Sequence, residues 1–223
     1  MNKLSKYKSI VFDCDGVVLD SNQVKTQAFY NAAQSFGNEA AQMLVEYHMK
    51  NGGISRYKKF NYFMSTIIGK GTDGDTLEAL LALFAKEVKK GLLHCKVASG
   101  LEILRKQTKQ ANWMIVSGGD QDELRDVFSE RDLAKLFDGG IFGSPDNKHI
   151  ILEREIRCEN IQLPALFVGD SKYDYEAANR AGLDFVFLTE LSEVKDWDAF
   201  FENKIVTIEK DIMSLVYKDE VEE

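Results

Sequence analysis

The segment SIVFDCDGVVLD at residues 9–20 decides the fold of this chain. Its first apolar residues, Ile-Val-Phe, form a short run of the kind found in buried strands of parallel sheets. Asp13 and Asp15 follow directly, and Gly16 allows the chain to turn sharply. Ligands of open α/β sheets bind at the carboxyl ends of the strands, so we expect chemistry here. The same two acids also fit an ordinary strand-to-helix loop, in which an aspartate caps the next helix.

The composition of the chain limits its possible partners. Its 223 residues include 28 Lys and Arg against 36 Asp and Glu, a formal net charge of −8, and 44% are hydrophobic. The chain can therefore bury a substantial core, and its acidity argues against nucleic acid or an anionic membrane as the main partner. No apolar run approaches the roughly 18 residues of a membrane helix, which favours a cytoplasmic protein. A small anionic substrate fits, because amides, a lysine and a cation can bind phosphate in an acidic protein.

The cysteines indicate a reducing compartment. Cys14, Cys95 and Cys158 are too few and too scattered for a disulfide framework or a zinc site. Cys14 lies between two acids, and its side chain should point away from theirs, because neighbouring residues of an extended chain alternate in direction. We therefore expect Cys14 to be a small core residue and not a reactive thiol.

A helical pattern begins after residue 20 and continues for about seventy residues. Asp20 or Ser21 can cap the first helix, Gly37 is placed to end it, and Gly91 is placed to end the last one. Apolar residues recur at helical spacing in each helix, and a Gly/Asp-rich loop at 70–75 precedes the last. The expected helices cover residues 21–36, 38–50, 55–69 and 77–90.

Short apolar runs alternate with helical segments from residue 99 onward, which predicts a parallel sheet with right-handed crossovers. The first strand belongs to this sheet by type. We therefore expect an α/β fold, a Rossmann-like parallel sheet in a three-layer core built from 1–19 and 96–223, with an all-helical domain at 20–95 inserted over the active end of the sheet. Expected strands at 113–116, 140–142, 165–168 and 185–188 alternate with helices at 101–109, 121–128, 149–157 and 173–180. A helix at 197–201, an edge strand at 205–208, a closing helix and a frayed tail at 218–223 complete the chain.

Three further strand ends carry polar groups. Ser117 and two glycines follow one strand, and their hydroxyl and N–H groups can hold an anion, although a plain turn is the alternative. Asp170 ends another strand and Asp174 follows four residues later, with helix capping by Asp170 as the alternative. Lys148 begins a helix, where a positive charge opposes the helix dipole; a solvated surface lysine is the alternative.

Together these strand ends predict a site for a divalent cation. Up to four carboxylates at one sheet edge would repel each other by about 1 to 4 kcal/mol per pair at 4 Å. A hard cation with oxygen ligands would relieve that repulsion, and such a site suits magnesium (Mg²⁺) better than zinc. A carboxylate, Mg²⁺, a lysine and a hydroxyl with neighbouring amides are also the groups that phosphoryl transfer needs.

The motifs resemble those of the haloacid dehalogenase-like superfamily of phosphatases and phosphomutases, in particular its helical-cap members of the phosphoglycolate phosphatase and β-phosphoglucomutase type. The segments 13–17 and 169–174 are similar to the first and fourth motifs of this family, and Ser117 and Lys148 stand where its second and third motifs would. The helical insertion is similar to the family's cap, so the resemblance spans nearly the whole chain. The sequence departs from the pattern at His149, where a proline is common.

The resemblance implies distinct roles for the two acids of the first motif. Asp13 would attack phosphorus and form an aspartyl-phosphate, and Asp15 would protonate the leaving oxygen and then activate water. Mg²⁺ would be held by Asp13, Asp170 and the backbone carbonyl of Asp15. True dehalogenases of the family lack the second acid, so the presence of Asp15 argues against dehalogenation.

The resemblance also implies supporting roles. Ser117 and the Gly118 amide would hold the phosphoryl oxygens, and Lys148 would neutralise nucleophile and phosphate. Asp174 and Ser171 would support this machinery, Asp174 by orienting Lys148 or a metal-bound water. In the cap, Arg56 is a candidate substrate contact, with a solvated helix-start arginine as the equal alternative. The weaker candidates or expected structural residues are Lys58, Lys59, His48 and His94, and the extra acid Asp120 has no assigned role.

The expected function is a Mg²⁺-dependent phosphatase that hydrolyses a small phosphomonoester, such as a sugar or sugar-acid phosphate, through an aspartyl-phosphate. The alternatives are a phosphomutase of the β-phosphoglucomutase type, a phospho-receiver module and a non-catalytic binding protein. The expected partner is a small phosphorylated metabolite, and the expected state is a monomer, with a weak dimer as the alternative.

Overall fold

A parallel sheet forms the centre of the molecule. We describe it from a computed structural model, in which residues 4–69 and 74–216 are described. The strands lie in the order β3-β2-β1-β4-β5-β6, and every neighbouring pair is parallel. This confirms the predicted α/β fold. Their bounds are β1 Ser9–Phe12, β2 Asn112–Asp120, β3 Gly140–Ser144, β4 Ala165–Gly169, β5 Asp184–Leu188 and β6 Thr207–Glu209.

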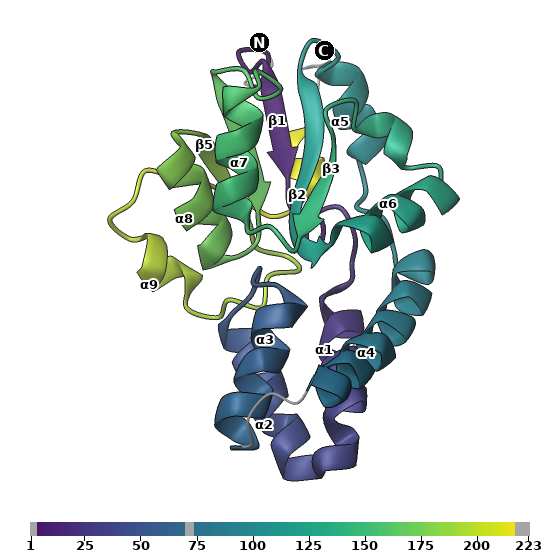
Figure 1. Ribbon diagram of the computed structural model, residues 1–223. Coiled ribbons are helices and arrows are strands. Elements are labelled where there is room, and N and C mark those ends of the chain that lie inside the picture. The colour runs from purple at the N-terminus through teal and green to yellow at the C-terminus, as the bar shows by residue number, and fades with distance from the viewer. Residues whose placement is uncertain (1–3, 70–73, 217–223) are drawn as a thin grey trace.

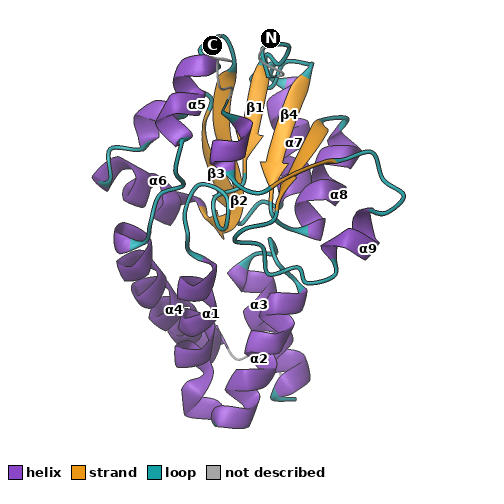
Figure 2. Ribbon diagram, turned by 180° about the vertical axis from the view of Figure 1, so that it is seen from behind, coloured by secondary structure: helices purple, strands orange, loops and turns teal. Residues whose placement is uncertain are grey.

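Helices cover both faces of the sheet (Figures 1 and 2). Along β1, Ile10 and Phe12 pack with buried residues of the helices on one face, and Val11 packs with those of the other face. This alternation follows from the period of two of an extended chain, and with both faces covered the strand is apolar throughout. On the first face lie α5 Leu101–Gln107 and α6 Gln121–Glu130, and on the second lie α7 Lys148–Arg157, α8 Lys172–Ala181 and α9 Trp197–Phe201.

Four helices lie together beyond the carboxyl ends of the strands, toward which the arrows of the sheet point (Figure 1). Their own core contains Phe29, Phe60 and Phe84, whose ring centroids are 4.2 to 5.6 Å apart. The helices are α1 Asn22–Ala33, α2 Asn38–Lys50, α3 Arg56–Tyr62 and α4 Gly74–His94, with a 3-10 turn at Gln34–Phe36 and a π turn at Phe63–Ile67.

The chain crosses from the sheet to these helices once and returns once, and the two connecting segments run side by side. The backbone N–H of Asp20 donates to the Lys96 carbonyl at 2.9 Å, and that of Ala98 donates to the Val18 carbonyl at 2.9 Å. The domain limits of 1–19 with 96–223 and 20–95 stay a prediction. None of the helices in the described part of the chain combines the length and hydropathy that a bilayer crossing requires.

The expected end of the fourth helix was wrong. Helix α4 continues through Gly91 to His94, because Gly91 serves close packing and not termination. A Cβ at this position would overlap the Val24 side chain of α1. The missing side chain thus lets two helices approach, an effect that the local pattern does not reveal.

Other boundaries also differ from the expectation. Strand β2 continues past Val116 to Asp120, with a register shift against β3, and the expected closing helix is a 3-10 turn at Ile212–Leu215. Ser21 precedes α1, but its side chain makes no capping hydrogen bond there. Most of the expected 70–75 loop and the expected frayed tail lie outside the described residues.

Candidate active site

A buried lysine joins the carboxyl ends of the strands. Asp13 directly follows β1, is only 3% exposed, and forms an ion pair through its Oδ1 with Lys148 Nζ at 2.9 Å. Lys148 is the first residue of α7 and also pairs with Asp174 Oδ1 in the first turn of α8. The structure thus brings together residues that are far apart in the sequence, and the alternative of a solvated Lys148 is wrong.

Asp174 holds both Lys148 and the start of its own helix. Its second oxygen, Oδ2, accepts hydrogen bonds from the Ser171 hydroxyl at 2.7 Å and the Ser171 N–H at 3.1 Å. Ser171 in turn caps α8, so these two residues form a capping box. Helix capping is therefore a task of Ser171 and not of Asp170, which leaves the Asp170 carboxylate available at the strand end.

The carboxylates at this edge form a group suited to a cation. Ligand oxygens of Asp13, Asp170 and Asp174 lie within 4.8 Å of one another, and all three residues are buried. Burial is the main cause that raises the pKa of Asp13 to about 7 and that of Asp170 well above its usual value, and the neighbouring carboxylates add to it. A divalent cation would offset both the cost of burying these carboxylate charges and the repulsion between them. Both oxygens of Asp174 are engaged, by Lys148 and Ser171, whereas Asp13 is bound through Oδ1 and Asp170 through Oδ2, which accepts a hydrogen bond from Asn22 at 3.0 Å. Asp13 and Asp170 therefore each keep an oxygen for a metal ion.

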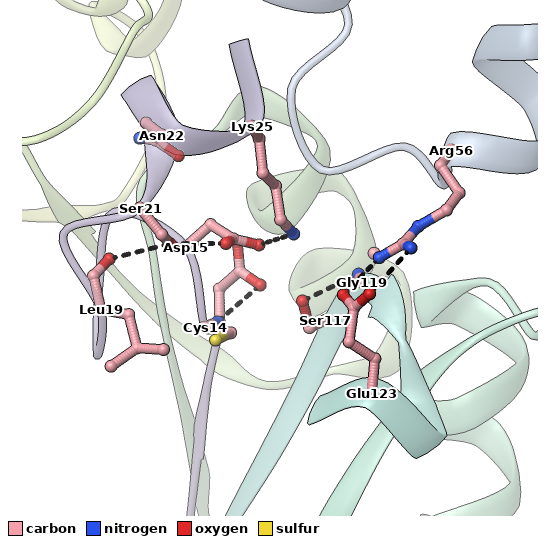
Figure 3. A network of polar contacts seen from close by, with 12 residues as sticks. Cys14, Asp15, Leu19, Ser21, Asn22, Lys25, Arg56, Ser117, Gly119 and Glu123 are labelled. Atoms are coloured by element: carbon pink, nitrogen blue, oxygen red, sulfur yellow. Dashed lines mark hydrogen bonds and ion pairs between the residues drawn. The ribbon is translucent and has the colours of Figure 1, made fainter. Parts of the chain in front are cut away.

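Asp15 lies in a different environment from Asp13, although only one residue separates them. Figure 3 shows Asp15 with Ser21 and Lys25. Its Oδ1 accepts a hydrogen bond from the Ser21 hydroxyl at 2.6 Å, and its Oδ2 forms an ion pair with Lys25 of α1. Burial alone would raise the pKa of Asp15, but Lys25 and Ser21 outweigh it and hold this pKa below its usual value. The Ser21 hydroxyl thus binds a site residue instead of capping its helix. Between the two acids, Cys14 is buried in the core as expected.

The end of β2 packs directly against the loop between α2 and α3. Ser117 is buried, and its hydroxyl accepts a hydrogen bond from the Gly119 N–H at 3.0 Å (Figure 3). A Cβ on Gly118 would overlap the carbonyl oxygen of Gly53. Glycine is therefore required at position 118, where the core and the helical block touch.

Gly118→Ala is expected to push the 52–54 loop away from the strand end. Relieving this overlap should cost about 1–3 kcal/mol, and we expect at least about a tenfold loss in kcat/KM because the loop faces the site. Steady-state kinetics with thermal melting would measure both effects. Gly74→Ala is the matched control, since its Cβ would meet open space. Equal effects of the two substitutions would contradict this contact.

The structure gives Asp120 a role that the sequence left open. Its Oδ1 accepts a hydrogen bond from the Glu123 N–H at 3.1 Å and so caps α6. Its Oδ2 accepts a hydrogen bond from the Tyr57 hydroxyl at 2.8 Å. Asp120 therefore links the core to the helical block beside the site.

Arg56 contributes to the same link. Its guanidinium binds both carboxylate oxygens of Glu123, at 3.0 and 2.5 Å (Figure 3). It also lies 4.6 Å from the centre of the Phe84 ring. The alternative of a solvated Arg56 is therefore wrong. Arg56 reaches the cavity, but its charge is already balanced by a core residue.

A cavity of about 60 Å³ lies between the sheet edge and the helical block. The core lines it with Asp13, Asp15 and Asp170, and the helices line it with cationic and aromatic side chains. Four further residues line it, namely Lys25, His48, Lys59 and Glu193. The sequence pattern did not single out Lys25 and Glu193, and it gave His48 a structural role and Lys59 a weak one. One available signal was helical spacing, because Lys59 lies three residues after Arg56 and must share its face of α3.

Comparisons with known proteins agree with this architecture. A family model described as haloacid dehalogenase-like hydrolase matches residues 7–182. A phosphorylated carbohydrates phosphatase of Thermotoga maritima is 24% identical over 191 residues, covering 81% of this chain and 84% of the relative. Among solved structures, a predicted phosphatase of Clostridium acetobutylicum superposes with a TM-score of 0.73 at 20% identity, covering 95% and 97% of the two chains. A candidate β-phosphoglucomutase of Bacteroides vulgatus has a TM-score of 0.71 at 17% identity, covering 94% of this chain and 86% of its own.

Proposed function

The chain belongs to the haloacid dehalogenase-like hydrolase family, and we propose that it is a Mg²⁺-dependent phosphatase that cleaves a small phosphomonoester through an aspartyl-phosphate. The observation that carries this proposal is the contrast between two neighbouring acids. Asp13 lies at the sheet edge with Lys148 and Asp170, whereas Asp15 faces the helical block and Lys25. Two carboxylates in such different environments suit different tasks.

Asp13 is placed to act as the nucleophile. Its Oδ1 accepts hydrogen bonds from Lys148 Nζ and from the Cys14 N–H at 2.8 Å, so the carboxylate is held in one orientation. The other oxygen attacks phosphorus, the bond between phosphorus and the leaving oxygen breaks, and Lys148 balances the charge on the phosphoryl group. The Ser117 hydroxyl and the Gly118 N–H hold the remaining phosphoryl oxygens.

Asp15 is placed to act as the acid and base. Lys25 holds the pKa of Asp15 low, so Asp15 must take up a proton as the negative charge of the bound substrate raises that pKa. It gives this proton to the leaving oxygen in the first step and takes a proton from water in the second. That water attacks phosphorus, which releases inorganic phosphate and restores the Asp13 carboxylate. Ser21 and Lys25 orient the Asp15 side chain beside the cavity.

A magnesium ion would bind to Asp13, Asp170 and the backbone carbonyl of Asp15. When bound, it would stabilise the charge that develops on the phosphoryl oxygens. Asp174 would act on this site through Lys148, with Ser171 fixing the orientation of Asp174.

The substrate we propose is a phosphorylated small metabolite of the carbohydrate or sugar-acid type. The Thermotoga maritima relative is named a phosphatase of phosphorylated carbohydrates, and its match to this chain covers most of both sequences, which supports this choice. The charged lining of the cavity also suits a polar, anionic ligand. Residues 20–95 would act as the cap that covers it, and Arg56 would help to close it through Glu123.

Hydrolysis of p-nitrophenyl phosphate is expected to require added Mg²⁺. Removal of divalent cations with EDTA should reduce phosphate release by at least about 10²-fold, because the buried carboxylates then lack their counter-ion. Activity should return with excess Mg²⁺ and not with excess Ca²⁺, whose larger coordination shell fits the site less well. Full activity in EDTA would refute the mechanism. Slow phosphate release that needs a sugar bisphosphate as activator would instead favour the phosphomutase.

A further inference from the structure

Among the described residues, one cation on the cavity wall has no carboxylate within ion-pair distance. Lys25 is paired with Asp15, Arg56 with Glu123, and Lys148 with two aspartates. Lys59 is only 2% exposed, yet across residues 4–69 and 74–216 no carboxylate lies within ion-pair distance of its Nζ. A buried ammonium without a partner is unfavourable, and burial together with Lys25 lowers the pKa of Lys59 to about 7.

The neighbour of Lys59 is a histidine with one ring nitrogen that has no partner in the described part of the chain. Lys59 Nζ lies 2.6 Å from His48 Nδ1, and His48 is only 6% exposed. The other ring nitrogen, Nε2, is buried and has no hydrogen-bond partner in the described part of the chain. When the ammonium donates to Nδ1, the ring proton resides on Nε2. The Nε2–H of His48 is then a buried donor without an acceptor among the described residues, Lys59 has His48 Nδ1 as its acceptor, and both residues line the cavity.

A purely structural role does not account for this pair. The position is surrounded by Phe29 and other core residues, with the Phe29 ring 5.4 Å from Lys59 Nζ and 4.6 Å from the His48 ring. A methionine or leucine would fill such a place without the cost of burying a charge. Glu193 lines the same cavity and its charge attracts Lys59, but it is not within ion-pair distance and accepts a hydrogen bond from the Thr26 hydroxyl at 3.2 Å.

We propose that Lys59 and His48 bind a second anionic group of the substrate, a carboxylate, at the helical wall of the cavity. The inference rests on the proposed phosphatase function and narrows the substrate to a phosphorylated carboxylic acid. One ammonium and one neutral imidazole supply a single positive charge and two donors. One positive charge and two donors match a carboxylate, whereas a second phosphate group would carry a charge of about −2.

The experiment compares matched substrates. Phosphate release is measured with Mg²⁺ from 6-phosphogluconate and sorbitol 6-phosphate, and from 3-phosphoglycerate and glycerol 3-phosphate, which differ within each pair mainly by the carboxylate. We expect kcat/KM to favour the acid of at least one pair by about 10- to 100-fold, the range of a buried charge-assisted hydrogen bond. In Lys59→Met the ratio of kcat/KM for the acid to kcat/KM for its neutral counterpart should fall to near one. In His48→Phe it should fall part of the way.

Two controls separate binding from folding. Lys58→Met removes the same charge from an exposed neighbour on α3 and should leave the preference for the acid intact. Lys59→Met should raise the melting temperature, because it removes an unpaired buried charge. A lower melting temperature, or an equal loss on acids and neutral substrates, would overturn the inference in favour of a structural role or a role at the phosphoryl group.

The substrates distinguish a missing carboxylate site from a missing phosphatase activity. If p-nitrophenyl phosphate is not hydrolysed at all, the phosphatase itself is refuted. If it is hydrolysed but neither acid is preferred, or a hexose bisphosphate is preferred to both acids, the phosphatase stands and the carboxylate site is refuted.

Discussion

Asp13→Asn is expected to reduce phosphate release to the background level, a loss in kcat of at least about 10⁴-fold. Asparagine has nearly the same shape as aspartate and can still accept a hydrogen bond from the Cys14 N–H, so the fold should be kept. It is a poor nucleophile and cannot form the aspartyl-phosphate. Steady-state phosphate release from p-nitrophenyl phosphate and from a sugar phosphate measures the effect.

Trapping of the intermediate makes this test sharper. When the wild-type enzyme is quenched with acid during turnover of a substrate labelled in its phosphoryl group, label should remain on the protein. Asp13→Asn should retain none. The melting temperature serves as the control, because Lys148 retains its second partner, Asp174, in this variant. Residual turnover of more than a few per cent of wild type would place the nucleophile elsewhere.

Asp15→Asn is expected to lose about 10²- to 10⁴-fold in kcat while it keeps its affinity for Mg²⁺. The side chain of Asp15 points toward Ser21 and Lys25, and only its backbone carbonyl is proposed to reach the metal ion. Calorimetric titration with Mg²⁺ should therefore give a Kd close to that of wild type. Loss of metal binding in this variant, with Asp170 intact, would contradict the division of tasks between the two acids.

The leaving group distinguishes the proton-transfer role of Asp15 from a purely structural one. An aryl phosphate leaves as a stable phenolate and needs little protonation, whereas a sugar leaves as an alkoxide and needs a proton. The loss in Asp15→Asn should therefore be smaller for p-nitrophenyl phosphate than for a sugar phosphate. Equal losses on both substrates would indicate that the substitution disturbs the site as a whole.

Much of the candidate site could be predicted from the sequence because short motifs occupy fixed places in this type of sheet. Each apolar run is a strand, and Asp13, Ser117 and Asp170 follow or end such runs. Parallel pairing brings the carboxyl ends of neighbouring strands to one edge, so residues that are distant in the chain meet there. The match to the hydrolase family over residues 7–182 confirmed the resemblance that these motifs indicated.

Features that depend on packing between elements could not be predicted in this way. Gly91 has the local signature of a helix end, yet it lies within α4 because Val24 of another helix packs against it. Asp120 and Arg56 each looked like isolated charges near the site. Their partners, Tyr57 and Glu123, lie more than sixty positions away in the chain, at a junction that only folding creates.

By itself, the sequence determined the α/β class and the acids at the strand ends, because strand and helix periodicity and the order of elements are local properties of the chain. The tertiary structure alone decided which charges are paired. Lys58 and Lys59 are adjacent and chemically identical, but a helix turns by about 100° per residue, so one is exposed and the other is buried. Burial and the distance to a counter-ion set the energy of a charge, and both depend on the packing of α3 against its neighbours.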